Sequence, residues 1–307
     1  MNPVTALIIT NIIWGAAPPI FKLALENIPP FTLAFIRFFF AAFLFLPFVL
    51  VQKQGITRKQ LFEICLGAFF GITINIAFFF LALPKTNSIN APIIGSAQPI
   101  FLFIFSILFL KEKFHFKVFW GILISFIGVL IIVLSPLFLN HGTTLLQKET
   151  ALEGNLLFMM ATLGAVLQAL IIKKVLKSVS HYIVSYLGFL FGAITFIPFM
   201  IPELQHWSFS QLNGNGWLGI IFGIFFSSAL AYGLFNYGIS KIHAQEVGIF
   251  SYIDPVIAML LAIPLLGEYP SPIFFVGSFC VFIGIVVAEG RVHWHPLHRL
   301  RNVARSM

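Results

Sequence analysis

KTNSINAPIIGSAQPIFLFIFSILFLKEKFHFKVFWGILISFIG (residues 85–128) and KIHAQEVGIFSYIDPVIAMLLAIPLLGEYPSPIFFVGSFCVFIG (residues 241–284) are the two stretches that reveal the architecture of this chain. At an offset of 156 positions they pair Lys85 with Lys241, Glu112 with Glu268, Gly121 with Gly277, Gly128 with Gly284, and the step Gln98-Pro99 with the step Asp254-Pro255. These coincidences on matching apolar backgrounds indicate a duplicated unit of about 150 residues. In an apolar chain, such a duplication is typical of transporters that bind their substrate between the two halves.

The composition indicates a membrane protein. Of the 307 residues, 59% are hydrophobic and 9% are charged, and the mean hydropathy is +1.00. Runs of about 18 or more apolar residues, each long enough to span a bilayer core, recur from end to end. The two cysteines, Cys65 and Cys280, lie in apolar runs and show no metal or redox spacing. We therefore expect an all-α integral membrane protein without a metal or a cofactor.

Ten transmembrane helices are predicted, in two repeats of five. They cover roughly residues 4–25, 31–51, 61–83, 89–110, 117–137, 154–173, 182–201, 215–239, 245–265 and 272–289. The corresponding divisions are a first repeat at 1–137, an external connecting loop at 138–153, a second repeat at 154–289 and a basic tail at 290–307. Because five is an odd number, the second repeat must enter the membrane inverted relative to the first.

The basic residues predict the orientation. With the N-terminus in the cytoplasm, the inner loops and the tail hold most of the 18 lysines and arginines, namely Lys53, Arg58, Lys59, Lys111, Lys113, Lys117, Lys173, Lys174, Lys177, Lys241, Arg291, Arg299, Arg301 and Arg305. Such a bias places both termini inside. The net charge of +8 then reflects the membrane surface rather than nucleic acid, and the tail is expected to contact anionic lipid.

The order of motifs resembles the drug/metabolite transporter superfamily, and in particular its ten-helix EamA-type exporters. The residues that carry this resemblance are Trp14-Gly15, Lys22, Arg37, the small-residue segment before Pro99, Leu110-Lys111-Glu112-Lys113, Pro255, Leu266-Gly267-Glu268 and the glycines of the last span. The resemblance covers nearly the whole chain. It implies export or exchange of small metabolites by alternating access, with helices 1–4 and 6–9 around a central cavity and helices 5 and 10 outside. The chain departs from the family where Gln98 and Asp254 precede the two prolines, since this residue is usually apolar.

Asp254 is the only aspartate in the sequence, and it is a candidate for coupling transport to a proton. It lies near the middle of the ninth predicted span, where a carboxylate costs a few kcal/mol or more if it faces lipid. It could bind a cationic substrate group or a coupling proton, and the alternative is a structural carboxyl bonded to a neighbouring helix. Gln98 is its counterpart in the first repeat. It could bind substrate, or it could hydrogen-bond to a neighbouring helix. Pro99 and Pro255 are predicted helix hinges.

Polar and aromatic residues on three further spans could line a cavity. Ser228, Tyr232 and Asn236 stand at spacings of four and therefore share one face of the eighth span. Asn75 with Phe79, and Asn11 with Trp14, place an aromatic ring one turn from an amide. Polar groups on membrane helices face protein or water rather than lipid, so these residues form either a cavity wall or packing contacts.

Two cations lie inside the predicted spans. Lys22 and Arg37 lie toward the outer ends of the first and second spans and could pair with a substrate carboxylate or phosphate. Lys22 could instead meet Glu26 one turn away, and both long side chains could reach the interface.

The sequence therefore predicts a transporter in the cytoplasmic membrane. We expect it to move a small polar or amphiphilic metabolite, such as an amino acid, outward by alternating access. The sequence leaves open an exchanger of nucleotide sugars or phosphate esters, a passive channel and an intramembrane enzyme acting on lipid. The motifs of serine hydrolases, metalloproteases and phosphate-binding loops are missing, so we expect no enzyme.

Overall fold

The chain folds as an all-helical protein. The computed structural model describes residues 1–52, 54–98, 101, 105, 116–138, 144–241 and 248–289, and these ranges contain no strand. The helices are α1 (Pro3–Leu25), α2 (Pro30–Leu50), α3 (Arg58–Ala68), η1 (Phe69–Ile74), α4 (Asn75–Ala82), α5 (Asn90–Gly95), α7 (Phe116–Phe138), α8 (Leu145–Val175), α9 (His181–Glu203), η2 (Phe209–Gln211), α10 (Gly214–Ile221), η3 (Phe222–Leu230), α11 (Ala231–Lys241), η4 (Gly248–Tyr252), α13 (Ile253–Leu266) and α14 (Pro272–Glu289). The all-helical class predicted from the composition is confirmed.

Many of these helices suit a bilayer. Within the described ranges, seven helical segments are long and apolar enough to cross a membrane: Pro3–Leu25, Pro30–Leu50, Arg58–Ala82, Phe119–Phe138, Leu145–Val175, His181–Glu203 and Gly214–Lys241. Phe250–Leu266 and Pro272–Gly284 are shorter apolar helices. Large apolar side chains such as Phe43, Phe48 and Phe279 are more than half exposed, as lipid-facing residues would be. The exact number of ten spans stays a prediction, since most of the fourth lies outside the described residues.

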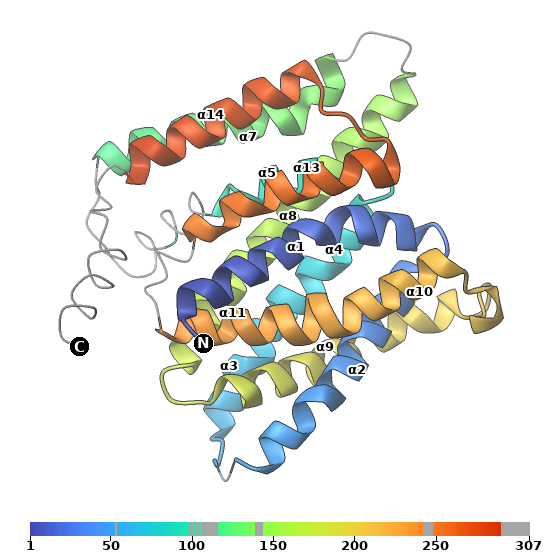
Figure 1. Cartoon of the computed structure of the whole chain (residues 1–307), viewed down its shortest axis with the longest axis vertical. Coiled ribbons are helices and arrows are strands. Elements are labelled where there is room, and N and C mark those ends of the chain that lie inside the picture. Colours follow the sequence, from blue (N-terminus) through green and yellow to red (C-terminus); the bar gives the residue numbers. More distant parts are fainter. Residues whose placement is uncertain are drawn as a thin grey trace.

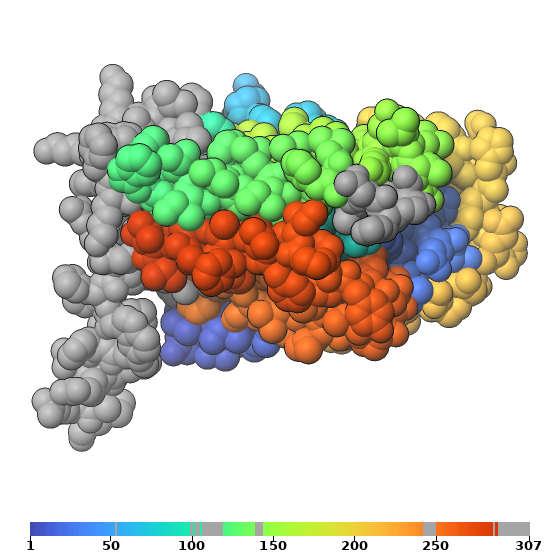
Figure 2. Space-filling view, turned by 90° about the horizontal axis from the view of Figure 1, so that it is seen from above, coloured from blue at the N-terminus to red at the C-terminus, as the bar shows by residue number. Residues whose placement is uncertain are grey.

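Helices α7 and α14 form a pair at one side of the bundle. They run side by side above the other helices in Figure 1, and Figure 2 shows them together along one face. A Cβ atom added at Gly128 would lie 2.5 Å from the carbonyl oxygen of Gly277, and one at Gly284 would collide with the carbonyl oxygen of Gly121. Between these two contacts the Ser125 hydroxyl donates to the carbonyl of Val281 at 3.1 Å. Gly128 of α7 thus meets Gly277 of α14, and Gly121 of α7 meets Gly284 of α14. Adding 156 to the number of each α7 glycine gives the α14 glycine of the other contact, so the two contacts are related by the repeat.

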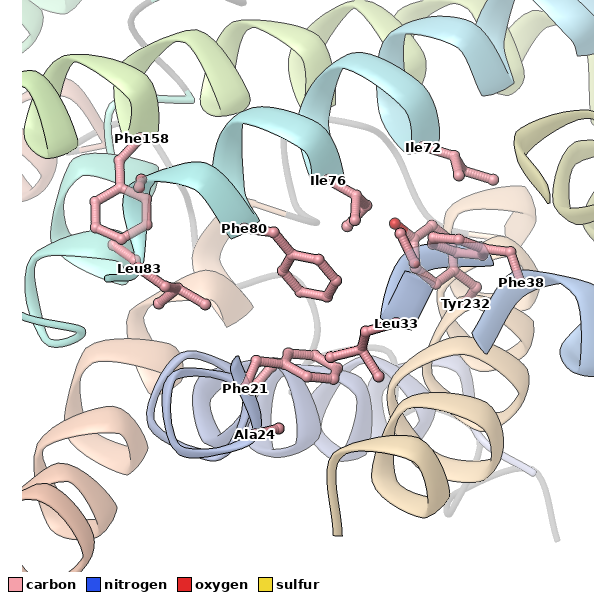
Figure 3. Packing of buried hydrophobic residues seen from close by; sticks show 14 of the residues in the cluster. Phe21, Ala24, Leu33, Phe38, Ile72, Ile76, Phe80, Leu83, Phe158 and Tyr232 are labelled. Atoms are coloured by element: carbon pink, nitrogen blue, oxygen red, sulfur yellow. The ribbon is translucent and has the colours of Figure 1, made fainter. Parts of the chain in front are cut away.

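The remaining helices enclose an aromatic core. Phe21 from α1, Phe38 from α2, Phe80 from α4 and Tyr232 from α11 point toward one another in Figure 3. Their rings pack edge to face, with a centroid distance of 5.1 Å between Phe21 and Phe80 and of 6.2 Å between Phe38 and Tyr232. This geometry is the one that aromatic pairs prefer. The core is therefore built from helices of both halves of the chain.

Two helices contain π-helical segments, which the sequence did not predict. η1 interrupts the third predicted span, and η3 interrupts the eighth. At the offset of 156, residues 69–74 of η1 correspond to residues 225–230, which lie inside η3. π-Helical turns are rare and occur often at functional sites. The same irregularity thus occurs at matching positions of the two halves.

The fourth and ninth predicted spans are not uniform α-helices over their described residues. α5 ends at Gly95, Ser96 and Ala97 form a turn, and Gln98 is helical again. In the ninth span a 3-10 turn, η4, ends at Tyr252 and α13 starts at Ile253. Asp254 is therefore in the first turn of α13. The change of helix type comes just ahead of Pro255, because proline suits the first turn of a helix but not its interior. The position of Asp254 near the middle of the ninth span stays a prediction, since residues 242–247 lie outside the described residues.

The connection between the halves is shorter than predicted. α8 begins at Leu145 instead of residue 154. Thr144 accepts a hydrogen bond from the backbone of Gln147, and the Gln147 side chain accepts one from the backbone of Thr144. This capping box satisfies donors at the helix start. The spacing Thr-x-x-Gln in the sequence indicates this helix start, but the prediction from apolar runs did not use it.

Candidate functional site

The helix ends define two faces of the bundle. The Glu268 face holds the C-terminal ends of α1 and α13 and the N-terminal ends of α2 and α5. The Lys174 face holds the C-terminal ends of α2 and α8 and the N-terminal end of α3. In Figure 1 the Glu268 face lies to the right. The polar side chains between these two faces are the candidates for a functional site.

Arg37 is the most deeply buried cation of the described residues. Its side chain is 1% exposed. The Nε atom donates to the Ser228 hydroxyl at 3.0 Å, and Nη2 donates to the Ser227 hydroxyl at 3.0 Å. The Nη1 atom has no acceptor among the described residues. Arg37 and Ser228, both predicted site residues, are thus brought together by α2 and η3.

Tyr232 and Trp14 extend this cluster toward the Lys174 face. The Tyr232 hydroxyl donates to the carbonyl of Gly71 in η1 at 3.4 Å. Trp14 packs edge to face on Tyr232 with centroids 5.2 Å apart, and its indole N–H donates to the carbonyl of Ser227 at 3.3 Å. Both acceptors lie in π-helical segments. α1, α2, η1 and η3 therefore meet through polar side chains at this one place.

A small cavity adjoins Tyr232 on the side of the Lys174 face. Tyr232, Asn236, Ser185 and Gln168 contribute polar groups to its lining. The Asn236 amide donates to the Ser185 hydroxyl at 2.9 Å. Ser228, Tyr232 and Asn236 were predicted to share a face, and all three are buried inside the protein. Their polar stripe leads from the Arg37 cluster into this cavity.

Glu268 ties three segments together at the face named after it. Its Oε1 accepts from Lys22 Nζ at 2.5 Å, and its Oε2 accepts from the backbone N–H and the hydroxyl of Ser88, each at 2.7 Å. Lys22 also donates to the carbonyl of Thr86 at 2.6 Å. Gly267, with φ of +64°, ends α13 and turns Glu268 toward these partners. Lys22 therefore pairs with Glu268, and the alternative partner Glu26 is not used.

Three of the other predicted residues act as packing groups. The Asn11 amide donates to the carbonyl of Leu7 in its own helix at 2.7 Å. The Asn75 amide donates to the carbonyl of Ala161 on α8 at 2.7 Å, and Phe79 packs against Phe158 on the same helix. These contacts join α4 to α8. The structure therefore does not place Asn11, Asn75 or Phe79 in the Arg37 cluster.

Asp254 lies where α13 packs against α1. A Cβ atom added at Gly15 would lie 2.8 Å from the Asp254 backbone, which shows how closely α1 and α13 approach. Its Oδ1 is buried without a hydrogen-bond partner among the described residues, and Pro255 is buried beside it. Gln98 is partly buried. Pro99 lies outside the described residues.

Four residues of these sites are not among those predicted from the sequence. Ser227 adjoins Ser228 and corresponds to Gly71 at the offset of 156. Gln168 and Ser185 are isolated polar residues in apolar helices, a signal that could have found them. In the sequence Glu268 is paired with Glu112 by the offset of 156, and its distant partners on α1 and at Ser88 required the tertiary structure.

Comparison with known proteins decides the family. The model of the EamA-like transporter family matches residues 1–134 and again residues 152–289. The chain belongs to the EamA-like transporter family. It is accordingly a multi-pass membrane protein and a transporter, as its apolar helices and the resemblance of its motifs predicted.

Individual EamA relatives cover nearly the whole chain. An uncharacterized transporter, YetK of Bacillus subtilis (strain 168), is 29% identical over 290 residues, which are 94% of this chain and 86% of the relative. A probable amino-acid metabolite efflux pump of Escherichia coli (strain K12) is 24% identical over 302 residues, 95% of each protein. A solved crystal structure at 16% identity matches with a TM-score of 0.63 over 92% of this chain and 97% of that chain. The last likeness shows that the fold is shared.

Proposed function

We propose that this EamA transporter carries a small polar or amphiphilic metabolite, such as an amino acid, across the cytoplasmic membrane by alternating access. One observation carries the proposal: a polar cluster is buried where the two family-matched halves meet. Arg37 and Trp14 come from the first half, and Ser227, Ser228 and Tyr232 come from the second. Polar groups inside a membrane protein are costly and commonly mark a substrate pathway.

The relation between the halves supports two alternative conformations. The glycine contacts of α7 and α14 and the π-helical segments recur at the offset of 156. An inverted repeat can adopt two packings of similar energy that open to opposite faces. The Glu268 network closes the face that we assign to the outside, and the small cavity beside Tyr232 lies toward the face that we assign to the cytoplasm. We therefore propose ten spans, with both termini and the basic tail in the cytoplasm.

Asp254 is our candidate for coupling. Its buried Oδ1 atom and its place in the first turn of α13 suit a group that binds a proton or a cation while access alternates. The relative named as a probable amino-acid metabolite efflux pump supports a substrate of about the size of an amino acid. Outward movement would then draw on the proton gradient.

The test is uptake into proteoliposomes of a pooled metabolite panel, with and without a proton gradient directed out of the vesicles, for wild type and Asp254→Asn. Accumulation that requires the gradient in wild type and loses this requirement in the variant would support coupling at Asp254. Saturable transport that ignores both gradient and variant would refute the coupling. Flux without saturation or counterflow would show a channel, and a chemically changed lipid without transport would show an enzyme.

A further inference from the structure

The guanidinium of Arg37 is a charge without a counter-charge in the described structure. Two of its three nitrogens are bound by neutral hydroxyls, and Nη1 is buried without an acceptor. The ion pairs among the described residues join Lys22 to Glu268, Lys85 to Glu153 and Lys174 to Glu63, and none includes Arg37. Burying a cation costs several kcal/mol unless it is paired. Its environment therefore leaves one side of the guanidinium available for an anion.

Aromatic rings form the other walls around this cation. The guanidinium carbon lies 4.7 Å from the centre of the Phe21 ring, 4.6 Å from that of Phe38 and 5.7 Å from that of Phe80. Each cation–π contact contributes about 0.5–2 kcal/mol, and none satisfies the N–H groups of Nη1. The rings come from α1, α2 and α4, so they surround the cation with apolar surface. A ligand that reaches Nη1 must therefore present apolar atoms beside its charged group.

The two hydroxyls hold the guanidinium in a defined orientation. Ser227 and Ser228 are neighbours in η3, and each binds a different nitrogen of Arg37. A planar guanidinium fixed in this way suits the geometry of a carboxylate, which accepts from it through two oxygens. Gly223, also in η3, lets the helix approach the side chain of Arg37 closely.

The charges near the site favour a carboxylate over a phosphate ester. Lys22, the other cation within the predicted spans, is bound to Glu268. A doubly charged phosphate would therefore meet one unneutralised cation and keep a net negative charge in the membrane, which is costly. A carboxylate matches Arg37 charge for charge.

We propose that Arg37 binds the carboxylate of the transported molecule, and that this molecule carries an apolar or aromatic group next to the carboxylate. This inference rests on the proposed transport function, because the site is closed in the described conformation and must open for a ligand to enter. Ser227 and Ser228 act as positioning residues that keep the guanidinium aligned.

The experiment is protection of Arg37 from phenylglyoxal, a neutral arginine reagent, in the full-length protein reconstituted in nanodiscs. Peptide mass spectrometry gives the rate of modification at Arg37, with Arg58 at the Lys174 face as the internal control. The probes are phenylacetate and L-phenylalanine, each with its amide, and phenyl phosphate. A carboxylate at about ten times its dissociation constant should slow modification of Arg37 about tenfold and leave Arg58 unchanged, and the matched amide should have no effect.

Several results would overturn the proposal. Arg37 would be structural if phenylglyoxal never modifies it, or if carboxylates and amides protect it equally or not at all. Protection by phenyl phosphate alone would assign the site to phosphate esters instead. In transport assays, Arg37→Gln should lower the ratio of carboxylate to amide uptake at least about tenfold, and an unchanged ratio would contradict the inference.

The two proposals fail separately. If carboxylates protect Arg37 but no metabolite shows saturable flux or counterflow, the anion site stands and the transport mechanism is wrong. If metabolites are transported and Arg37→Gln transports them with unchanged selectivity, transport stands and the anion site is wrong.

Discussion

Removing the charge of Glu268 should open the Glu268 face. In Glu268→Gln, the side-chain oxygen can keep both hydrogen bonds from Ser88, but the amide NH₂ then faces Lys22, and two donors cannot bond. If the amide turns round, Lys22 keeps its acceptor and the backbone N–H of Ser88 is left without one. Either orientation removes a hydrogen bond that Glu268, whose side chain is 8% exposed, makes in the wild type.

The size of the effect follows from the hydrogen bond that the glutamine cannot make. A hydrogen bond to a charged group contributes about 1.5–3 kcal/mol, and Lys22 is 22% exposed, which leaves it partly shielded from water. We expect the closed conformation to be destabilised by roughly 2–3 kcal/mol, which increases the open fraction about 30- to 140-fold. The matched control is Glu153→Gln, which breaks the exposed pair with Lys85 at the same face and should change the balance by about 0–1 kcal/mol.

Thiol labelling measures the opening. Leu33 is buried one turn into α2 from the Glu268 face and packs in the aromatic core (Figure 3). Leu33→Cys, in a protein with Cys65 and Cys280 replaced by serine, should react with a charged methanethiosulfonate about 30- to 140-fold faster when Glu268→Gln is added. Equal rates for Glu268→Gln and Glu153→Gln would refute the reasoning, provided that both proteins keep the same melting temperature. A lower melting temperature for Glu268→Gln alone would make the network a structural tie rather than a gate.

Three further experiments test the packing of the helices. Gly128→Ala should destabilise the protein by about 1–3 kcal/mol through overpacking, because its Cβ would meet the carbonyl of the facing glycine on α14. Thermal melting should show this destabilisation. The control Gly55→Ala, which has open space around it, should leave the melting temperature unchanged. Asn155→Ala removes a fully buried amide that bonds side chains near α5 and two carbonyls of α7. We therefore expect about 1–3 kcal/mol of destabilisation in a denaturation series. An unchanged denaturation midpoint would contradict this expectation. The Thr73 and Thr195 hydroxyls lie 2.6 Å apart, and a double-mutant cycle with valine at both positions should give a coupling of about 0.6–1.7 kcal/mol, whereas additive effects would show that the hydrogen bond contributes nothing.

Local patterns in the chain predicted the class of fold and several helix boundaries. Long apolar runs are enough to predict membrane helices, because the bilayer demands the same length and composition of each one. The start of α1 lies within one residue of its predicted position. The offset of 156, read from single residues, also marked the glycines that meet between α7 and α14. Such features depend on neighbours in sequence or on one repeating register, and therefore appear in the sequence itself.

Which polar side chains meet depends on the packing of the helices. Lys22 bonds Glu268, 246 positions away, rather than Glu26 on its own helix, and Arg37 bonds two serines about 190 positions away. Asn75 resembled a cavity residue in sequence but joins two helices. The physical reason is that, in an apolar environment, each polar group must bond the partner that helix packing brings within reach. The apolar runs were therefore enough to predict helices that cross a membrane, whereas the packing of those helices left one nitrogen of the buried Arg37 unpaired among the described residues.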